Sequence, residues 1–218
     1  MRNPITKSQM GAERASRSVG LESFALRVRE SRTQRERSVE GVCQWAIVLK
    51  DIPIYTFVRP PMGSIADQVS LREITADTVR AVTKLAVTEY QNRFVASNAV
   101  SLAQALFTPE AWYRAIYLGD EPVGFVMLED ESLRKPIPES PQVGVWRFMV
   151  DTKHQRKGVG RAAMLLVIDH VRSKGLFDKL AISYIPDEGG PELLYLSLGF
   201  RPTGEMDEDE VVMELALG

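Results

Sequence analysis

The chain has 218 residues, of which 44% are hydrophobic, and this is enough for one well-buried domain with an appendage. The formal net charge of -2 is uneven, because residues 1–61 hold 11 Lys and Arg against 6 Asp and Glu, while the remainder holds 16 against 23. An acidic body disfavours broad contact with a phosphate backbone and suits a cationic ligand. We therefore expect no nucleic-acid partner.

Cysteine and hydropathy patterns narrow the class further. The single Cys43 excludes an internal disulfide and a cysteine metal cluster, so we predict no metal and a cytoplasmic location. The most apolar stretch, 42–58, is interrupted by Lys50, Asp51 and Pro53. It falls short of the roughly 18 uncharged residues that span a bilayer, so we expect no membrane segment.

The N-terminal part differs in composition from the rest. Residues 1–40 are rich in Arg, Ser and Glu, with too few apolar residues for a core, which is typical of a disordered or loosely helical segment. Residues 41–61 predict one or two short strands that end at the turn-forming Pro60 to Gly63. We therefore expect an N-terminal extension over 1–61 and a domain over 62–218, with Met62 as an alternative start.

Regular patterning begins at Val69. Alternating and helical periodicities predict strands separated by helices, which require crossover connections and therefore a mixed sheet of the α/β or α+β class. The expected order is strand 69–74, helix 75–93, helix 99–107, a hairpin of 115–118 with 123–128, a polar loop 129–142, strand 143–150, helix 159–174, strand 180–185, helix 192–198 and a closing hairpin over 200–217.

A glycine-containing loop joins the strand at 143–150 to the helix at 159–174. Gly158 and Gly160 allow backbone N–H groups to approach an anion, and the helix N-terminus adds partial positive charge. Arg156, Lys157 and Arg161 add full charges. The loop therefore predicts a site for a pyrophosphate.

Two nucleotide-binding motifs fit this loop poorly. Residues 158–163 match G-x-G-x-x-A, but several residues separate the strand from Gly158, and Asp178 opens the following strand instead of ending it. No Lys followed by Ser or Thr comes after the glycines, which excludes a Walker A loop.

The segment Gln155 to Gly160 matches the pattern Q/R-x-x-G-x-G/A at every fixed position, and it lies between Arg147 to Val150 and Tyr195 to Phe200. In this context it resembles the acetyl-CoA signature of the GNAT N-acetyltransferases. The resemblance covers about two thirds of the chain. It implies acetyl-CoA as co-substrate and a mixed, mostly antiparallel sheet with helices on both faces.

The resemblance also implies roles for individual residues. The backbone of Phe148, Met149 and Val150 would contact the pantetheine arm and the thioester carbonyl, and Tyr195 would protonate the leaving sulfur. An Asn that the family often places before the Tyr helix is absent from 186–191. The residues that would hold the pyrophosphate are Gln155, Arg156, Lys157, Gly158, Val159, Gly160 and Arg161.

Attack on a thioester needs a neutral amine. Deprotonating an alkyl amine at pH 7 costs roughly 4 to 5 kcal/mol, so a base is required. His154 is expected in a solvated loop and His170 in an amphipathic helix, so no His or Cys is placed as a covalent intermediate. Direct transfer in a ternary complex follows, with Glu89, Glu129 or a water chain as alternative bases.

Within the superfamily, segments 94–98, 123–127, 147–150 and 183–186 resemble bacterial diamine and polyamine (spermine/spermidine) acetyltransferases. This resemblance implies a small polyamine acceptor and allows a homodimer. We expect Glu89 and Glu129 to bind the amine, beside Asp130 and Glu131, which a solvated acidic loop explains nearly as well. Acetylation of an aminoglycoside, an amino acid or a protein N-terminus stays open, as does a non-catalytic CoA-binding module.

Overall fold

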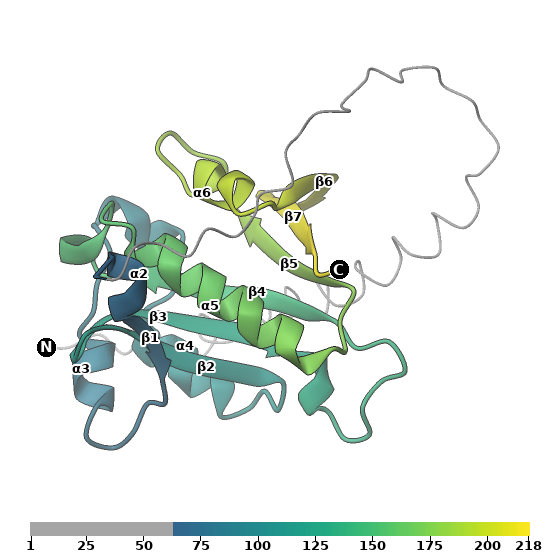
Figure 1. Ribbon diagram of the computed structural model, residues 1–218, viewed down its shortest axis with the longest axis horizontal. Helices are drawn as coiled ribbons and strands as arrows, with labels where there is room; N and C mark the ends of the chain where they lie inside the picture. Colours follow the sequence, from purple (N-terminus) through teal and green to yellow (C-terminus); the bar gives the residue numbers. More distant parts are fainter. Residues whose placement is uncertain (1–62) are drawn as a thin grey trace, which may run out of the picture. The chain divides into compact units, whose positions relative to one another are not determined.

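Residues 63–218 are described by the structure, a computed structural model. The extension and strands expected before residue 62 lie outside the described residues. The described part is built around a seven-stranded sheet in the order β1-β2-β3-β4-β5-β7-β6 (Figure 1). The strands are β1 (Val69–Arg72), β2 (Ala111–Leu118), β3 (Glu121–Asp130), β4 (Val143–Val150), β5 (Lys179–Tyr184), β6 (Arg201–Asp207) and β7 (Glu210–Ala216).

Neighbouring strands pair antiparallel except β4 and β5, which are parallel. The expected mixed, mostly antiparallel sheet is therefore confirmed. The α-helices are α2 (Ile65–Gln68), α3 (Val79–Thr83), α4 (Asn98–Ala105), α5 (Val159–Lys174) and α6 (Glu192–Ser197), and the 3-10 turns are η1 (Tyr90–Arg93), η2 (Glu131–Leu133) and η3 (Thr152–His154). Among residues 63–218, no helix has the length and apolar character needed to cross a membrane.

Strand β3 shows how the two faces of the sheet are covered. Val126 and Leu128 join the larger apolar cluster with α5 and α6, whereas Phe125 and Met127 join a second cluster with α3 and α4. This alternation follows from the two-residue period of a strand. In Figure 1 α5 lies in front of the sheet and α4 behind it, so helices cover both faces.

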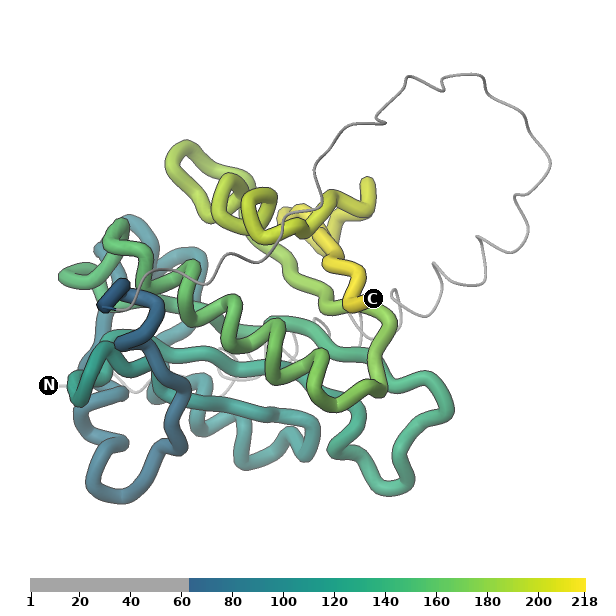
Figure 2. The backbone as a smooth tube through the Cα atoms, viewed as in Figure 1, coloured from purple at the N-terminus to yellow at the C-terminus, as the bar shows by residue number. Residues whose placement is uncertain are grey.

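The backbones of β4 and β5 diverge like a wedge, and the region between them is called the opening below. The two strands pair only through Gly144 with Ala181 and Val145 with Ile182. Beyond these pairs a bulge interrupts β4, because Met127 faces Arg147 whereas Leu128 faces Val145. Figure 2 shows the two strands parting toward their C-terminal ends, so that from Trp146 onward β4 has no strand partner on the β5 side among the described residues.

The helix expected over 75–93 is wrong. Only Val79–Thr83 is α-helical, and a separate 3-10 turn follows at Tyr90–Arg93. Ala86 explains the break, because its N–H donates to the Asp151 carboxylate and its carbonyl accepts from the backbone and hydroxyl of Thr152. These contacts with the end of β4 replace the hydrogen bonds that a continuous helix would form.

The β2–β3 hairpin is longer than the sequence pattern predicts. Strand β2 begins at Ala111 instead of 115, and β3 continues to Asp130. The segment 129–142, which was expected to be a polar loop, therefore begins with the end of β3 and the 3-10 turn η2. This extension carries Glu129 onto the sheet, next to the start of β4.

Candidate active site

The glycine loop lies between η3 and the N-terminus of α5. Gly158 is the residue before the helix and has a φ of 89°, in the left-handed region that a glycine adopts without strain. The first turn of α5 contains no acidic residue, so nothing there neutralises the partial positive charge of its N–H groups. Arg156, Lys157 and Arg161 are exposed around this end. The loop is therefore built to receive an anion.

Gln155 connects this loop to its surroundings. Its side-chain Nε2 donates to the carbonyl oxygen of Val150 at 2.9 Å and to Oε1 of Gln91 at 3.0 Å. The amide thus joins the end of β4, the glycine loop and η1. The Gln of the sequence motif thus holds the loop against neighbouring elements of the protein, a contact that the sequence pattern did not predict.

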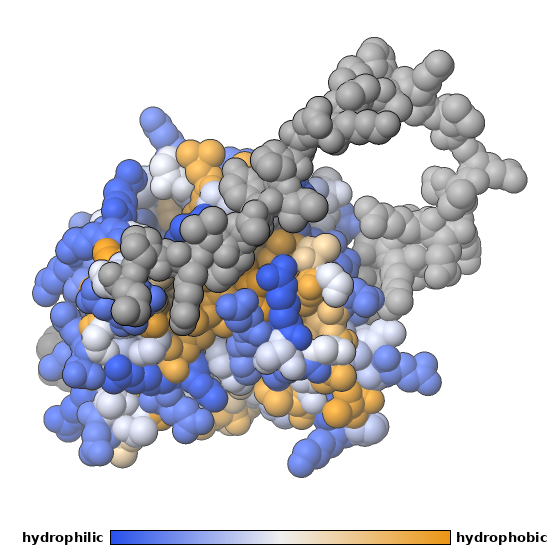
Figure 3. Space-filling model, viewed as in Figure 1, coloured by the Kyte–Doolittle hydropathy of each residue, from blue (hydrophilic) through white to orange (hydrophobic). Residues whose placement is uncertain are grey.

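The walls of the opening are apolar. Phe148 is half-buried and Met149 and Val150 are buried on β4. A methyl group placed on Gly160 would lie 3.7 Å from Val150 and 3.8 Å from Phe148, so the start of α5 packs closely against this strand. On the face seen in Figure 3, apolar side chains gather between α5 and β5, with polar side chains around them.

Gly124 on β3 determines how closely β3 and β4 approach here. A side chain at this position would place its Cβ 2.6 Å from the carbonyl oxygen of Met149. That distance is far inside van der Waals contact, so only glycine fits without a shift of β4. The position of the β4 backbone beside the opening depends on this close approach.

Tyr195 lies on α6 and is 5% exposed. Its ring contacts Tyr184 and Phe200, each with a centroid separation of 5.9 Å. Burial raises the pKa of the phenol above its usual range, and the charge of Glu210 adds to this effect. The hydroxyl therefore stays protonated at neutral pH and is available as a donor.

Glu210 is a residue that the sequence interpretation missed. It opens β7, accepts a hydrogen bond from the hydroxyl of Ser183, and lies close enough to Tyr195 to influence its pKa. In the sequence it is one of several acids in the hairpin after residue 204, and no motif distinguishes it. Only the pairing of β5 with β7 brings it to the opening.

Glu129 faces Gly144 and lies on the same face of the sheet as Phe125 and Met127. Burial raises its pKa to about 7, with the nearby Arg134 opposing the shift. It lies at the closed end of the opening, three residues along β3 from the partner of Phe148, or about 10 Å along the strand.

The two acids that follow Glu129 are neither substrate anions nor a solvated loop. Asp130 is 1% exposed and is ion-paired with Lys174 of α5, while Ser132 donates to the same carboxylate. Glu131 is 2% exposed and pairs with Arg134 at 2.9 Å. Both side chains anchor the end of the hairpin.

Glu89 lies apart from Glu129. It is exposed and immediately precedes η1, at the open end of the wedge. The structure therefore separates the two carboxylates that the sequence reading expected to bind the amine. They lie at opposite ends of β4, because η1 is tied to the end of that strand and Glu129 to its start.

Both histidines contact side chains of the surrounding fold. His154 lies 3.9 Å from Asp151 and 3.7 Å from Glu121 at the base of the glycine loop. His170 stacks on Trp112 with ring centroids 4.2 Å apart, and burial lowers its pKa. Each thus packs within the scaffold.

The model of the acetyltransferase (GNAT) family matches residues 79–200, which is more than half of the chain. The chain belongs to this family. It is 29% identical over 157 residues to the spermine/spermidine N(1)-acetyltransferase of Bacillus subtilis, covering 67% of this chain and 99% of that one. It is also 26% identical over 114 residues to N-acetyltransferase 8 of Rattus norvegicus, covering 48% of this chain and 51% of that one.

Solved structures support the same fold. The PaiA N-acetyltransferase of Thermoplasma acidophilum, in complex with coenzyme A, superposes with a TM-score of 0.51 at 11% identity, covering 68% of this chain and 98% of that one. The ribosomal-protein-S18-alanine N-acetyltransferase of Escherichia coli gives a TM-score of 0.51 at 15% identity, covering 69% and 94%. The GNAT chain described here is an acetyl-CoA-dependent N-acetyltransferase, as the sequence motif predicts.

The residues present fit this co-substrate. The N-terminus of α5 offers uncapped N–H groups and three exposed cations where a pyrophosphate requires them. The opening between β4 and β5 offers apolar walls and an unpaired strand edge for the arm that carries the thioester. Within residues 63–218 no group of three or more potential ligands suited to a metal ion is found.

Proposed function

We propose that this GNAT enzyme acetylates a primary amine of a polyamine such as spermidine or spermine, by direct attack in a ternary complex. The excess of acidic residues over 62–218 supports a cationic acceptor. The similarity to a spermine/spermidine N(1)-acetyltransferase over almost the full length of that relative supports the same substrate class.

The observation that carries the proposal is the state of Glu129. Most surface carboxylates have pKa values near 4 and are weak bases at pH 7. Burial raises the pKa of Glu129 to about 7. A group of this pKa, at the closed end of the opening, accepts protons efficiently in the physiological range.

In this proposal Glu129 removes a proton from the incoming ammonium through a chain of water molecules. The neutral nitrogen then forms a bond to the carbonyl carbon of the thioester. The carbon–sulfur bond breaks as Tyr195 protonates the sulfur, and the second proton of the nitrogen returns the Tyr195 phenolate to its phenol form. Bound acetyl-CoA supplies the activated acyl group. The same carboxylate, while ionised, attracts the acceptor, so it serves both as base and as part of the amine site.

Two further groups stabilise charge during this step. Backbone N–H groups of Phe148 and Val150 point to the strand edge left without a partner, since that of Met149 faces β3, and they donate to the oxygen that becomes negative. The Tyr195 hydroxyl donates to the leaving sulfur. A phenol carries its proton at neutral pH even at its usual pKa, and burial raises the pKa of Tyr195 further.

The glycine loop positions the co-substrate. Arg156, Lys157 and Arg161 neutralise the pyrophosphate together with the N–H groups from Gly158 to Gly160. Gln155 holds the loop against the end of β4 through its bond to Val150. Arg161 also donates to the Ser197 hydroxyl at 2.7 Å, which links α5 to the helix of Tyr195.

Turnover with a panel of amines tests the proposal. CoA release would be measured with spermidine, spermine, putrescine, lysine and an aminoglycoside under identical conditions. We expect the highest kcat/KM with a polyamine. A preference for lysine or the aminoglycoside would contradict the polyamine assignment, and CoA binding without turnover on any amine would favour a CoA-binding module.

A further inference from the structure

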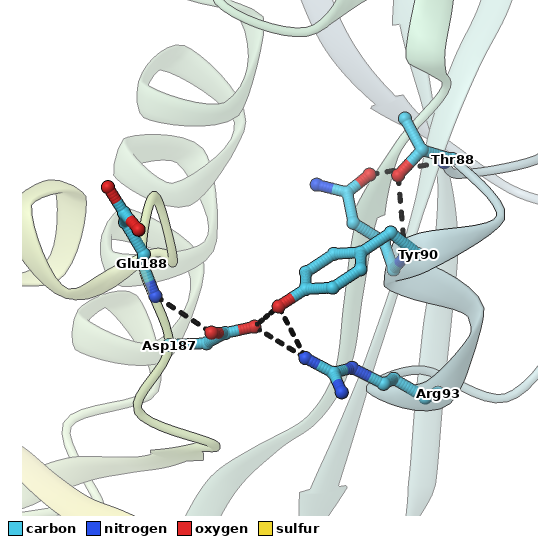
Figure 4. Close-up of polar contacts among 6 residues, drawn as sticks. Thr88, Tyr90, Arg93, Asp187 and Glu188 are labelled. Carbon is cyan, nitrogen blue, oxygen red and sulfur yellow. Dashed lines mark hydrogen bonds and ion pairs between the residues drawn. The ribbon is translucent and has the colours of Figure 1, made fainter.

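A charged contact crosses the open end of the wedge between β4 and β5 (Figure 4). The Arg93 guanidinium of η1 lies 2.8 Å from Oδ2 of Asp187, and the Tyr90 hydroxyl donates to the same oxygen. The guanidinium carbon of Arg93 also lies 4.2 Å above the ring of Tyr90 and 4.5 Å above that of Phe94. One cation is thus surrounded by a carboxylate and two aromatic rings.

The position of this cluster follows from its neighbours. Gln91 in η1 accepts from Gln155, whose amide also bonds the end of β4 at Val150. Asp187 comes three residues after the end of β5. The cluster therefore lies near the C-terminal ends of the two strands and next to the glycine loop, since a side chain on Gly189 would lie 3.6 Å from the Arg156 guanidinium.

A carboxylate beside aromatic faces is a general way for proteins to hold an organic cation. Here the cation is the chain's own Arg93. Its side chain is 56% exposed, whereas the Asp187 side chain is 22% exposed, so Arg93 contacts the carboxylate from the solvent side. Exposed ion pairs contribute little to stability. A ligand ammonium therefore competes with Arg93 at little cost to the fold.

We propose that Tyr90, Phe94 and Asp187 form a binding site for an ammonium group of the acceptor, and that Arg93 occupies this site until the acceptor displaces it. The proposal rests on the amine acetylation described above and names the residues that select its substrate. The reacting nitrogen attacks near Phe148, two residues before the end of β4. A polyamine carries further ammonium groups along its chain, and one of them reaches this cluster.

Asp187 is suited to this exchange of cations. Its hydrogen bond with Tyr90 lowers the pKa of the carboxyl, and the bond to Arg93 acts in the same direction. It therefore stays ionised at neutral pH. Rotation of the exposed Arg93 toward solvent leaves the carboxylate and both rings in place for the incoming cation.

Steady-state kinetics of two variants test the proposal in opposite directions. Asp187→Asn removes the charge that attracts the amine, so we expect the KM for spermidine to rise about 10-fold. Arg93→Met removes the competing cation, so we expect the KM for spermidine to fall about threefold or more. The KM for acetyl-CoA stays within about twofold in both variants.

The chain offers a matched control at β1, β2 and the turn that follows β2. Arg72 lies 3.2 Å from Asp120 and 4.5 Å above the ring of Tyr117, an equivalent trio far from the opening. Arg72→Met and Asp120→Asn should leave both KM values unchanged. A rise in the spermidine KM for Arg93→Met, or equal rises in the acetyl-CoA KM for Arg93→Met and Asp187→Asn, would show a structural clasp and overturn the proposal.

Binding measurements separate this inference from the polyamine assignment. Calorimetric titration with spermidine and with tetraethylammonium needs no turnover, so it reports on the cluster even if the parent enzyme prefers another amine. We expect both cations to bind the parent and Arg93→Met proteins, and to bind Asp187→Asn about 10-fold more weakly. Equal binding to Asp187→Asn and parent would overturn the site whatever amine is acetylated.

Discussion

The two faces of the sheet carry opposite charge beside the same opening. On the α5 face, Arg156, Lys157 and Arg161 surround the start of a long helix, with no acid in its first turn. Glu129 lies on the α3 and α4 face, at the closed end of the wedge. The cations thus lie at the open end of the wedge and this carboxylate at its closed end, with the unpaired edge of β4 between them.

The neighbouring residues Glu129 and Asp130 lie on opposite faces of the sheet and differ in how their charge is stabilised. Their side chains point to opposite faces, and Asp130 is stabilised in its charged form by Lys174. Glu129 has no hydrogen bond or ion pair of its own within residues 63–218, and burial raises its pKa. Pairing holds the Asp130 carboxylate in its charged form, whereas burial raises the pKa of the Glu129 carboxyl.

Substitution of Tyr195, which lies on the α5 side of the sheet, is expected to give the largest effect. Tyr195→Phe removes the donor to the leaving sulfur but keeps the ring that packs against Tyr184 and Phe200. We expect kcat to fall about 10- to 1,000-fold while the Kd of acetyl-CoA stays the same. An unchanged kcat would remove the acid role from this tyrosine.

Removing positive charge from the start of α5 should weaken binding of the co-substrate specifically. The double variant Arg156→Ala with Lys157→Ala should raise the Kd of CoA roughly 10- to 50-fold, and high salt should shrink the difference. Lys153→Ala is the matched control, since Lys153 is an exposed cation of the preceding turn. If Lys153→Ala weakens CoA binding as much, net charge and not the glycine loop governs affinity.

Glu129→Gln tests the closed end of the wedge and the base together. We expect kcat/KM for spermidine to fall at least about 10-fold at pH 8, because both proton removal and attraction of the amine are lost. In the parent, kcat/KM should decline as the pH falls below about 7, where Glu129 becomes protonated. A parent profile that is flat from pH 6 to 8 would exclude Glu129 as the base.

Glu129→Gln should lower activity but raise the free energy of unfolding above pH 7. The folded protein binds the Glu129 proton more tightly than the unfolded chain does. The stability gained from this tighter binding is fully present below the pKa of an ordinary Glu, and it is lost as the pH rises through about 7. The loss amounts to about 3 kcal/mol. Urea unfolding should find Glu129→Gln more stable than the parent at pH 8 and similar to it at pH 5.

Glu89→Gln should have a smaller effect than Glu129→Gln. Glu89 is exposed at the open end, where water screens its charge. We expect the KM for spermidine to rise about two- to fivefold at low salt and to match the parent at high salt. An effect on kcat alone would assign this residue to proton transfer instead.

The smallest effect should come from removing the N-terminal extension. We propose that residues 62–218 form the catalytic unit, since the family model lies within them. A protein that begins at Met62 should acetylate spermidine with a kcat/KM within about twofold of the full chain. Insoluble or inactive protein would place residues 41–58 within the catalytic fold.

Sequence patterning was sufficient where local chemistry determines structure. The strand at 143–150 and the helix at 159–174 have the expected bounds, because apolar periodicity and Gly158 define them. The segment 75–93 was not predictable from periodicity, because its break depends on Asp151 and Thr152, far along the chain. Tertiary contacts to the backbone overrode local helix propensity there.

The site divides in the same way. The roles of the glycine loop and Tyr195 were predicted because motifs of fixed spacing carry them, and they stay predictions. Asp187 and Glu210 were missed, since each acquires its surroundings from a partner in another element, Arg93 and Ser183 respectively. The roles first considered for Asp130 and Glu131 also failed for this reason, because their pairing partners cannot be read from spacing.

The pairing of β4 with β5 through two residue pairs has a consequence for motion. It leaves β5, β6, β7 and α6 joined to the rest of the sheet through a short seam at Gly144 and Val145. Small rotations about such a seam widen or narrow the wedge without disturbing the strands on either side. Amide hydrogens of β2 and β3 are then expected to exchange as one slow unit, while those of β5 at the wedge exchange faster and slow down when the wedge is filled.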